Sequence, residues 1–350
     1  EIGIRAIIKK KQAIISSTNL ESDNINKLID KVVEMAKVVP EDEFCGLAEE
    51  KNYENINKEN SELQLFDSYK PKIKEINEKV LELENSALEN KQIINSEGAE
   101  LSFSSVKYHL MASNGFQTEI NKTHSDYIVA VLAGNKNSME RAYDYKSKVF
   151  FDDLGNFKKI GKKVSVDAIK KLNSRKIKTC KSDVIFDSRI SSSLLSNLFN
   201  ACNASAIIKG TSFLKNHKEK KVFNSKINVI DDPHMKKRLR SKFFDAEGLT
   251  TKKQHLIENG TLKFFFNCLS TARQLKDTPS RHGSRSISSI PSASYSNLYL
   301  DKGDYKKKDM IKSMKKGLLV TELMGSSINY ANGDYSRGAS GFWIENGEIS

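Results

Sequence analysis

The amino-acid sequence predicts an α+β fold: an N-terminal antiparallel sheet with packed helices, followed by a β-rich C-terminal domain with one or two helices. Apolar residues between positions 22 and 90 recur at steps of three and four, which is the period of amphipathic helices. From residue 101 to 151 the period changes to two, as in half-buried strands. After residue 182, short apolar runs alternate with turns that contain glycine. Helices on one face of an antiparallel sheet bury both apolar surfaces.

The first predicted domain covers residues 1–175. It opens with two short strands within residues 2–19, joined at a turn of lysines. A helix capped by Ser22 or Asp23 follows and stops before Pro40, because the residue before a proline avoids the helical conformation. Two further helices are expected at residues 71–90 and 162–174. Between these helices we expect four strands of an antiparallel meander, at residues 101–113, 116–122, 127–133 and 142–151.

The second predicted domain covers residues 182–350, after a link at residues 176–181. It opens with a strand at residues 184–186 and a helix from 189 to about 206. The last stretch, residues 317–349, holds the only tryptophan and ends at an Asn-Gly turn, the strongest short-range signal of a hairpin. The other apolar runs predict strands at residues 222–230, 256–268, 298–300 and 318–323.

The chain has 350 residues, enough for a substantial core in two domains. It begins with Glu1 and stops at Ser350 just after a hairpin turn, so we expect a piece of a longer chain. Lys and Arg exceed Asp and Glu by 13, which is compatible with nucleic acid, an acidic partner or a membrane surface. The lysines are scattered along the chain, and the densest basic run, residues 236–242, lacks the interleaved aromatics of a base-stacking surface. The sequence therefore disfavours nucleic-acid binding.

The cysteines lie far apart and form no CxxC pair, so the spacing of a zinc finger is absent. They are Cys45, Cys180, Cys202 and Cys268. Isolated thiols in a chain of this size fit a reducing compartment. No apolar run approaches the length that spans a bilayer. We therefore expect a cytoplasmic protein that has no membrane partner.

An ordered series of short motifs runs along nearly the whole chain. It includes FDAEG at residues 244–248, LIENGTL at 256–262, TARQL at 271–275, HGSRS at 282–286 and GDYSRGASGFWIENGEI at 333–349. In this order the motifs resemble the TldD/PmbA family. By that resemblance, the TldD branch is a zinc protease with an HExxxH helix and a later Cys. The PmbA branch, also called TldE, is its partner without that motif, and the stretch at 333–349 is similar to this branch.

The resemblance, aligned on residues 211–214, places the TldD zinc motif over residues 196–201 of this chain. Zinc catalysis needs imidazole ligands and a carboxylate that handles the proton of the bound water. The ligand positions hold Ser196 and Ala201, and the general-base position holds Asn197. Serine is a poor zinc ligand, alanine has no ligand atom and asparagine cannot take a proton. We therefore expect no metal and no catalytic residue in this chain, and zinc in a TldD-type partner.

Elsewhere the sequence offers no replacement for this site. No two of the six histidines lie at the spacing of helical zinc ligands, and neither HExxH nor GxSxG occurs. The chain also departs from the family at several glycines. The turn at residues 216–220 lacks one, and Arg238 and Arg281 stand where the family usually has glycine. We expect altered loop geometry at these positions.

The first functional hypothesis, which the resemblance implies, is a PmbA/TldE-type subunit of a two-component, zinc-dependent cytoplasmic protease that acts on unfolded peptides. The TldD-type partner would hold the zinc and cut, and this chain would help to bind an extended peptide, for which strand addition to a sheet edge is a physical route. The candidate peptide- or partner-binding residues are Asp245, Glu247, Gly248, Gly333, Asp334, Ser336, Arg337 and Gly338. A structural role, with Asp and Arg paired across a turn, explains them equally well.

Two other functions stay open. The chain could be a metallopeptidase in its own right, which a cleavage assay of the purified chain with zinc would decide. It could also be a basic nucleic-acid-associated protein, which its net charge of +13 and the family's older label as a gyrase modulator suggest. A steep salt dependence of DNA affinity would support this last hypothesis.

Overall fold

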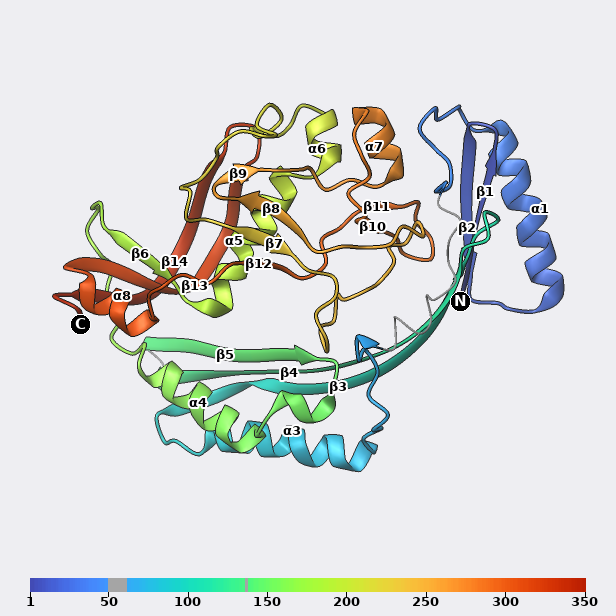
Figure 1. Ribbon diagram of the computed structural model, residues 1–350. Helices are drawn as coiled ribbons and strands as arrows, with labels where there is room; N and C mark the ends of the chain where they lie inside the picture. The colour runs from blue at the N-terminus through green and yellow to red at the C-terminus, as the bar shows by residue number, and fades with distance from the viewer. Residues whose placement is uncertain (50–61, 136–137) are drawn as a thin grey trace.

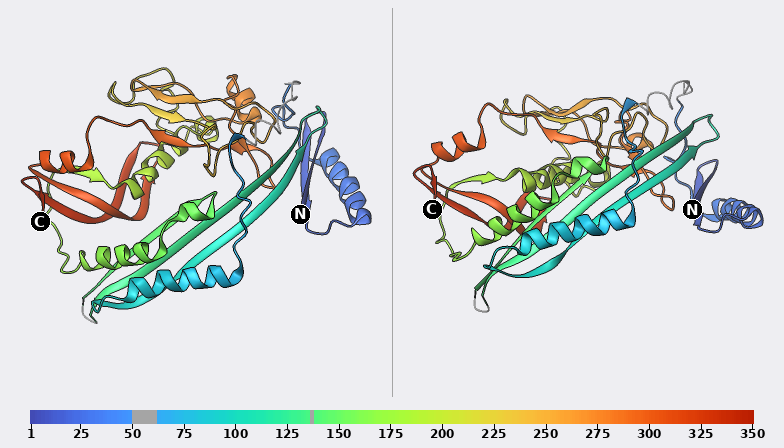
Figure 2. Two further views of the ribbon diagram at one scale, coloured as in Figure 1. Left: turned by 60° about the horizontal axis from the view of Figure 1, so that its bottom comes forward. Right: turned by 90° about the horizontal axis from the view of Figure 1, so that it is seen from below.

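The computed structural model describes residues 1–49, 62–135 and 138–350. A long antiparallel sheet, ordered β3-β4-β5, runs across the molecule in Figure 1. Two helices cover one face of this sheet. The C-terminal part, residues 183–350, lies over the other face. Figure 2 shows the helices from below. This layer consists of α3 (Ile73–Leu88), β3 (Ile93–Met111), β4 (Gln117–Asn135), β5 (Ser138–Lys148), the 3-10 helix η1 (Phe151–Leu154) and α4 (Phe157–Ile169).

The core between the long sheet and its helices follows from the two sequence periods. Alternate side chains of a strand point to opposite faces, and on β4 Tyr127 and Val131 are buried on the face that meets the helices. They belong to one apolar cluster with Leu83 of α3 and Val164 of α4. The predicted helices at 71–90 and 162–174 are thus confirmed, although the second begins and ends about five residues earlier than expected.

The two strands predicted between residues 116 and 133 are wrong as separate elements, because they form the single strand β4. The polar residues that predicted a break continue the ladder with β3, where Phe103 lies opposite Ser125. Thr123 is buried, and its hydroxyl donates to the Val149 carbonyl at 2.9 Å. A hydroxyl that finds an acceptor can be buried in a strand at little cost.

A small unit at one end of the molecule contains β1 (Ile2–Ile8), β2 (Lys11–Ser17) and α1 (Ser22–Val38). The strands form the predicted antiparallel pair, and α1 packs on one of its faces. The cap prediction for this helix is wrong. Glu21, rather than Ser22 or Asp23, precedes the first helical residue, and its side chain makes no capping bond.

The C-terminal part contains three sheets within the described residues. In the first, ordered β15-β14-β13-β6, the strand β6 (Asp183–Phe186) runs parallel to β13 (Lys316–Asn329), which forms a long hairpin with β14 (Asp334–Glu345). The second is ordered β12-β7-β8-β9, and the third pairs β10 with β11. The other elements are α5 (Ser188–Ala201), α6 (Ala204–Ile208), β7 (Val229–Asp231), β8 (Gln254–Glu258), β9 (Thr261–Leu262), α7 (Leu269–Leu275), β10 (Gly283–Ser284), β11 (Ser292–Ala293), β12 (Leu298–Leu300), α8 (Lys307–Ser313) and β15 (Glu348–Ile349).

This arrangement confirms the predicted α+β class and corrects its details. The helix predicted at 189–206 is two helices, because Asn203 caps α6 by accepting a hydrogen bond from the Ser205 amide at 3.0 Å. The short helices α7 and α8 were not predicted. The strand predicted at 222–230 shrinks to the three residues of β7. The strand range 256–268 contains only the short pair β8 and β9.

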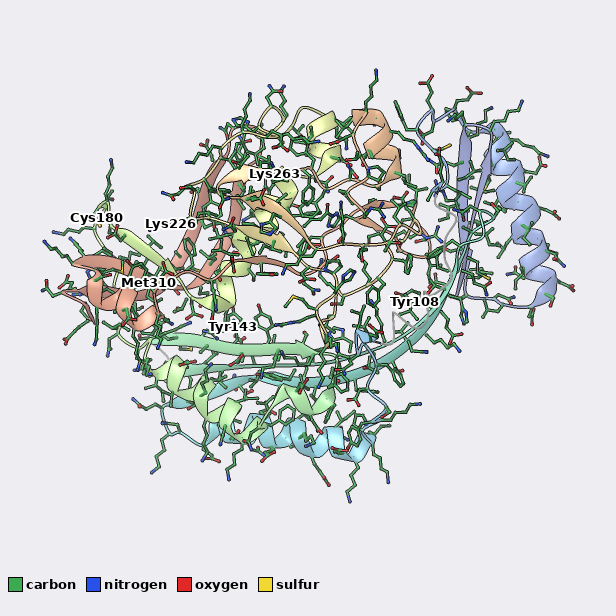
Figure 3. The ribbon with its side chains drawn as sticks, viewed as in Figure 1. Tyr108, Tyr143, Cys180, Lys226, Lys263 and Met310 are labelled. Carbon is green, nitrogen blue, oxygen red and sulfur yellow. The ribbon has the colours of Figure 1, made fainter. Side chains whose placement is uncertain are left out.

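The C-terminal part contacts the long sheet at the end where β5 lies. Arg189 of α5 donates to the Tyr143 carbonyl at 3.1 Å, and Lys171 pairs with Glu322 of β13 at 2.9 Å. Tyr143 is labelled on β5 in Figure 3, and its ring stacks on Tyr145 with centroids 6.2 Å apart. Alternate side chains of β5 point to opposite faces of the sheet. Ala142 belongs to the core between the sheet and the helices, so Tyr143 and Tyr145 lie on the face turned away from α4.

Two of the positions without the expected glycine adopt a backbone that favours glycine. Arg281 has a φ of 66° and Glu219, in the turn at 216–220, has a φ of 58°. Side chains with a Cβ atom adopt this left-handed region at a cost. Arg281 offsets part of it, since its guanidinium donates to the Thr250 carbonyl at 2.8 Å.

Within the ranges that the structure describes, no helix is both long enough and apolar enough to cross a membrane.

Candidate functional site

Helix α5 carries Ser196, Asn197 and Ala201, the three residues that the resemblance places over the zinc motif. Ser196 lies with its hydroxyl 3.3 Å from the hydroxyl of Tyr295. The Oδ1 atom of Asn197 accepts a hydrogen bond from the hydroxyl of Tyr330 at 3.0 Å. Ala201 is buried in the main apolar cluster of the C-terminal part. The three side chains therefore face different neighbours, and two of them are held by tyrosines from distant segments.

These residues do not fit a zinc ion. Ala201 has no atom that can coordinate a metal, and the carbonyl oxygen of Asn197 already accepts a bond from Tyr330. A catalytic zinc site needs three protein ligands and an open position. In the part of the chain that the structure describes, no group of three or more His, Cys, Asp or Glu side chains could hold a metal ion.

A pocket of about 370 Å³ opens beside the C-terminal end of α5. Its lining consists of Asn200, Ala206, Thr211, Ile328, Asn329, Tyr330 and Ala331. The Asn200 side chain donates to the Tyr330 hydroxyl at 3.1 Å, so this one hydroxyl joins two residues of α5 to the turn between β13 and β14. The turn of the long hairpin is thereby fixed against the helix.

The five candidate residues of the hairpin are Gly333, Asp334, Ser336, Arg337 and Gly338, at and after the turn. The Oδ2 atom of Asp334 accepts from Asn332 at 2.7 Å, and the Nε atom of Arg337 donates to the Met324 carbonyl at 3.3 Å. Asp334 and Arg337 therefore do not form the pair that the structural explanation assumed. In the described part of the chain, no strand pairs with the outer edge of β14 before Ile344.

The three candidates of the acidic turn have internal contacts. Asp245 is 3% exposed, and its Oδ1 atom accepts the amides of Glu247 at 2.9 Å and Leu249 at 3.1 Å. Its Oδ2 atom accepts the amide of Gly283 at 2.9 Å. Gly248 has a φ of 85°, and a Cβ atom there would lie 2.9 Å from the Phe116 ring. The turn thus holds β10 and the tip of the long hairpin β3–β4 together.

Glu247 lies beside Asp245 and faces a set of arginines. Its Oε2 atom accepts the amide of Leu269, the first residue of α7, at 2.7 Å. Burial, followed by the charge of Asp245, raises the pKa of Glu247 to about 7, while the Leu269 amide, Arg5 and Arg273 act in the opposite direction. Arg273 in turn donates to two carbonyls of the segment at residues 44–47. Through Arg5, this carboxyl group also faces the N-terminal unit.

We expect the free energy of unfolding to depend on the charge of Glu247. The folded chain keeps its proton up to about pH 7, whereas the unfolded chain releases it near the ordinary value of 4.5. The folded state therefore binds more protons in this window, and this group lowers stability by about 3 kcal/mol as the pH rises through it. Glu247→Gln cannot lose a proton, so its stability should fall less steeply with pH.

Urea unfolding of both proteins at several pH values between the two pKa values and above them measures this difference. Comparison with Glu247→Gln cancels the other titrating groups. Parallel stability curves for the two proteins would show that Glu247 titrates alike in both states.

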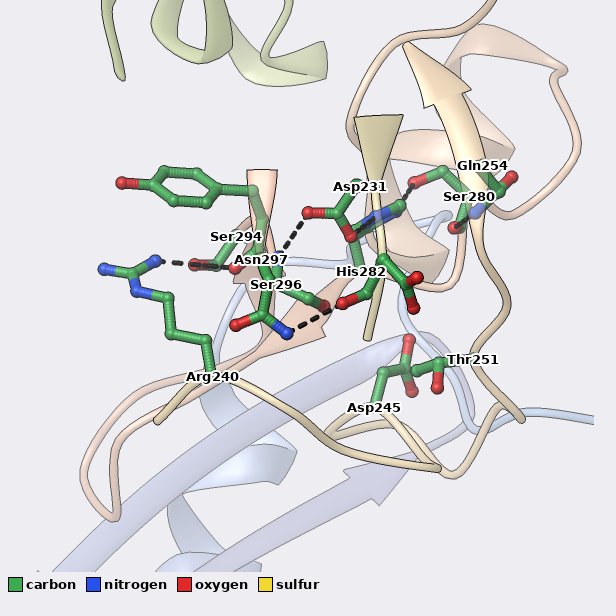
Figure 4. Close-up of polar contacts among 12 residues, drawn as sticks. Asp231, Arg240, Asp245, Thr251, Gln254, Ser280, His282, Ser294, Ser296 and Asn297 are labelled. Atoms are coloured by element: carbon green, nitrogen blue, oxygen red, sulfur yellow. Dashed lines mark hydrogen bonds and ion pairs between the residues drawn. The ribbon is translucent and has the colours of Figure 1, made fainter. Parts of the chain in front are cut away.

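A buried polar network that the sequence did not reveal lies next to this turn (Figure 4). His282 is 2% exposed and places its Nε2 atom 3.0 Å from the Oδ2 atom of Asp231, which is fully buried. Its Nδ1 atom lies 3.1 Å from the Ser280 hydroxyl. The other oxygen of Asp231 accepts the Ser296 amide at 2.8 Å. A charged residue in the apolar run Val-Ile-Asp of β7 was the available signal of this network.

The Ser280, His282 and Asp231 side chains have the order of a catalytic triad but lack its exposed nucleophile. Ser280 is 5% exposed, and its hydroxyl donates to the Asn267 carbonyl at 3.1 Å while accepting the Asn267 amide at 2.8 Å. A nucleophilic serine needs a free hydroxyl beside its base. This network therefore joins β7, β10 and the segments around them.

The structure does not bring the two groups of candidate residues together. Gly333 packs near Phe213, whereas Asp245 bonds to β10, and no hydrogen bond or ion pair within the described residues joins the acidic turn to the hairpin. Their roles as peptide- or partner-binding residues stay a prediction.

Comparison with known proteins identifies the family. Residues 66–172 match the family model of the PmbA/TldA metallopeptidase central domain, and residues 179–350 match that of the C-terminal domain. The chain is 33% identical to a metalloprotease PmbA homolog of Buchnera aphidicola subsp. Acyrthosiphon pisum, over 98% of this chain and 74% of that protein. It is 28% identical to metalloprotease PmbA of Escherichia coli O157:H7, over 99% of this chain and 75% of that one.

Solved structures share the fold. A Bacteroides thetaiotaomicron protein described as a candidate modulator of DNA gyrase superposes with a TM-score of 0.90 at 26% identity, over 99% of this chain and 77% of that one. TldE from Thermococcus kodakarensis gives a TM-score of 0.81 at 24% identity, over 99% and 78%.

The chain has an α+β fold, and its two matched domains are those of a PmbA/TldA metallopeptidase. A TldD homolog from the same Buchnera matches only 40% of this chain, whereas the PmbA homologs match nearly all of it. The chain belongs to the TldD/PmbA family, in its PmbA branch.

Proposed function

We propose that this chain is the PmbA/TldE-type subunit of a two-component, zinc-dependent protease in the cytoplasm, and that it does not cut peptides itself. A TldD-type partner holds the zinc and cleaves unfolded peptides. The observation that carries this proposal is that the hydroxyls of Tyr295 and Tyr330 contact Ser196 and Asn197 of α5. Where a protease of this family needs zinc ligands and a base, this chain has side chains that serve its own packing.

The free edge of β14 supports the binding role. An extended peptide that adds to a sheet edge gains backbone hydrogen bonds, which give affinity without demanding one sequence. Asp334, Ser336 and Gly338 lie along this edge and are exposed, Arg337 on the same strand is half-buried, and Gly333 is exposed in the turn before it. They can therefore reach a peptide or a partner strand, whereas the acidic turn already uses its oxygens internally.

The deciding experiment compares the purified chain with a complex formed by co-expression with a TldD-type chain. Both are assayed on an unfolded peptide with added zinc, and zinc is counted per complex. We expect cleavage that a chelator abolishes from the complex and none from the chain alone. Chelator-sensitive cleavage by the chain alone would overturn the proposal and establish a metallopeptidase in its own right.

A further inference from the structure

A second, smaller pocket lies where β5 ends and the segment around Leu65 continues alongside β4. The Thr123 amide of β4 donates to the Leu65 carbonyl at 3.0 Å there. The pocket has a volume of about 180 Å³. Its lining consists of Leu65, Ser104, Val106, Lys122, Thr123, His124, Val149 and Leu239. Four of these side chains are aliphatic, and one, that of Lys122, ends in an ammonium group.

Lys122 is the charged group of this pocket, and nothing in the described chain neutralises it. Its ammonium donates to the Ser241 carbonyl at 3.3 Å, and no ion pair of Lys122 occurs among the described residues. Burial, together with the charge of Lys242, lowers the pKa of Lys122 to about 8. An uncompensated charge in a desolvated place is costly, so an anion that enters the pocket gains from this charge.

We propose that the pocket binds a carboxylate attached to a short branched aliphatic group, with Lys122 as its counter-charge. The last residue of a peptide and a free short-chain acid both present this chemistry. An apolar cavity of about 150 Å³ is large enough for benzene, so the volume of about 180 Å³ suits a carboxylate with a side chain such as that of leucine. Val106, Val149 and Leu239 supply the apolar wall.

The lining favours a carboxylate over a phosphate. A phosphate carries more charge and has more oxygens to satisfy, and in this pocket those oxygens would face Leu65, Val106 and Val149. A carboxylate needs only the ammonium and one or two further donors. Of the other polar residues of the lining, the Thr123 hydroxyl already donates to the Val149 carbonyl and the Ser104 hydroxyl to the His124 carbonyl, so the His124 ring is left as the further donor. The site is formed by this chain alone, so it does not rest on the proposed protease function.

The pocket joins two parts of the molecule. Leu239 and Ser241 belong to the loop at residues 233–243, which leaves the C-terminal part and meets the long sheet. The Lys237 amide of this loop also donates to the Leu63 carbonyl at 2.8 Å. A ligand held between Lys122 and Leu239 would therefore contact both parts at once.

The test titrates the purified chain with N-acetyl-leucine, a peptide that ends in leucine, and 4-methylpentanoate, each followed by NMR or calorimetry. N-acetyl-leucinamide, which lacks the carboxylate, is the matched ligand control. We expect Lys122→Met to weaken carboxylate binding by about tenfold or more, because a charge-assisted hydrogen bond is lost. Lys107→Met, on the neighbouring strand, removes an exposed ammonium paired with Glu119 and should leave the affinity unchanged.

The same titration at about pH 9.5 should give a several-fold to tenfold weaker affinity than at about pH 7, because Lys122 loses its proton between these values. The other titratable groups near it are Lys242 of the loop and His124 of β4. Lys122→Met exchanges a buried ammonium for an apolar chain, so it should keep the fold, which thermal unfolding verifies. In Lys122→Met the pH effect should disappear.

Stronger binding of the leucine-ending peptide than of 4-methylpentanoate would identify a peptide terminus, and the reverse order a free acid. Equal binding of N-acetyl-leucinamide, full affinity in Lys122→Met, or no binding of any of the three carboxylates would each overturn the proposal.

Discussion

Replacement of His282 by alanine should lower the free energy of unfolding by about 5 kcal/mol, the largest effect that we expect from a single substitution in this chain. The imidazole is the buried partner of the Asp231 carboxylate, at 3.0 Å. Its ring also packs on Phe266, with centroids 4.7 Å apart, and stacks on Phe264 at 5.6 Å. The substitution therefore leaves a cavity between aromatic rings and a buried carboxylate with one hydrogen bond fewer.

Urea unfolding followed by circular dichroism measures this loss. His124→Ala is the matched control, since that side chain is 47% exposed and its removal should cost less than about 0.5 kcal/mol. In the background of His282→Ala, a second change of Asp231 to Asn should restore part of the stability, because it removes the uncompensated charge. A loss within about 1 kcal/mol for His282→Ala would contradict the role given to this pair.

Replacement of Asp245 by alanine should cost about 4 kcal/mol, because it removes the acceptor of three backbone amides at once. Those amides belong to Glu247, Leu249 and Gly283, at 2.9 to 3.1 Å. Each buried donor left without a partner costs about 1–3 kcal/mol. Part of the loss is offset, since burial raises the pKa of Asp245 and the wild-type carboxylate is itself unfavourably desolvated.

Asp245→Asn separates the contributions of the two oxygens. It keeps Oδ1 for the turn amides but presents an amide group to the Gly283 amide, so about half of the loss should remain. Asp334→Ala, at the acidic candidate of the hairpin, removes an exposed side chain bonded to Asn332 and should change stability by less than about 0.5 kcal/mol. Equal losses for Asp245→Ala and Asp334→Ala in thermal or urea unfolding would refute the structural role of the acidic turn.

The periodic parts of the fold could be predicted from the sequence. Helices α1 and α3 and the strands β1, β2 and β6 lie where the apolar period places them, because each buries one face against a neighbour. The irregular C-terminal segments could not be predicted in the same way. Residues 222–253 contain only the short strand β7, and side chains such as Asn224 and Asp232 bond to nearby amides in their turns.

The candidate site, too, was predictable only in part. The resemblance to the family predicts that Ser196, Asn197 and Ala201 stand where a TldD-type protein has its zinc motif, and these residue types supply no set of zinc ligands. The tyrosines that hold two of these residues are 99 and 133 positions away in the sequence, and no local pattern connects them. The ammonium of Lys122 was likewise hidden, since its surroundings depend on where the loop at 233–243 meets β4.

The parallel pairing of β6 with β13 has a consequence for the order in which the chain folds. It joins residues about 130 positions apart, and a ribosome adds roughly 5–20 residues per second. The apolar strand β6 therefore waits on the order of ten seconds for its partner, while β3, β4 and β5 can pair with sequence neighbours much earlier. During that interval its edge is open to wrong pairing. The basic stretch before it, with Lys176, Lys178 and Lys181, is the kind of charged flank that keeps such a nascent strand from aggregating.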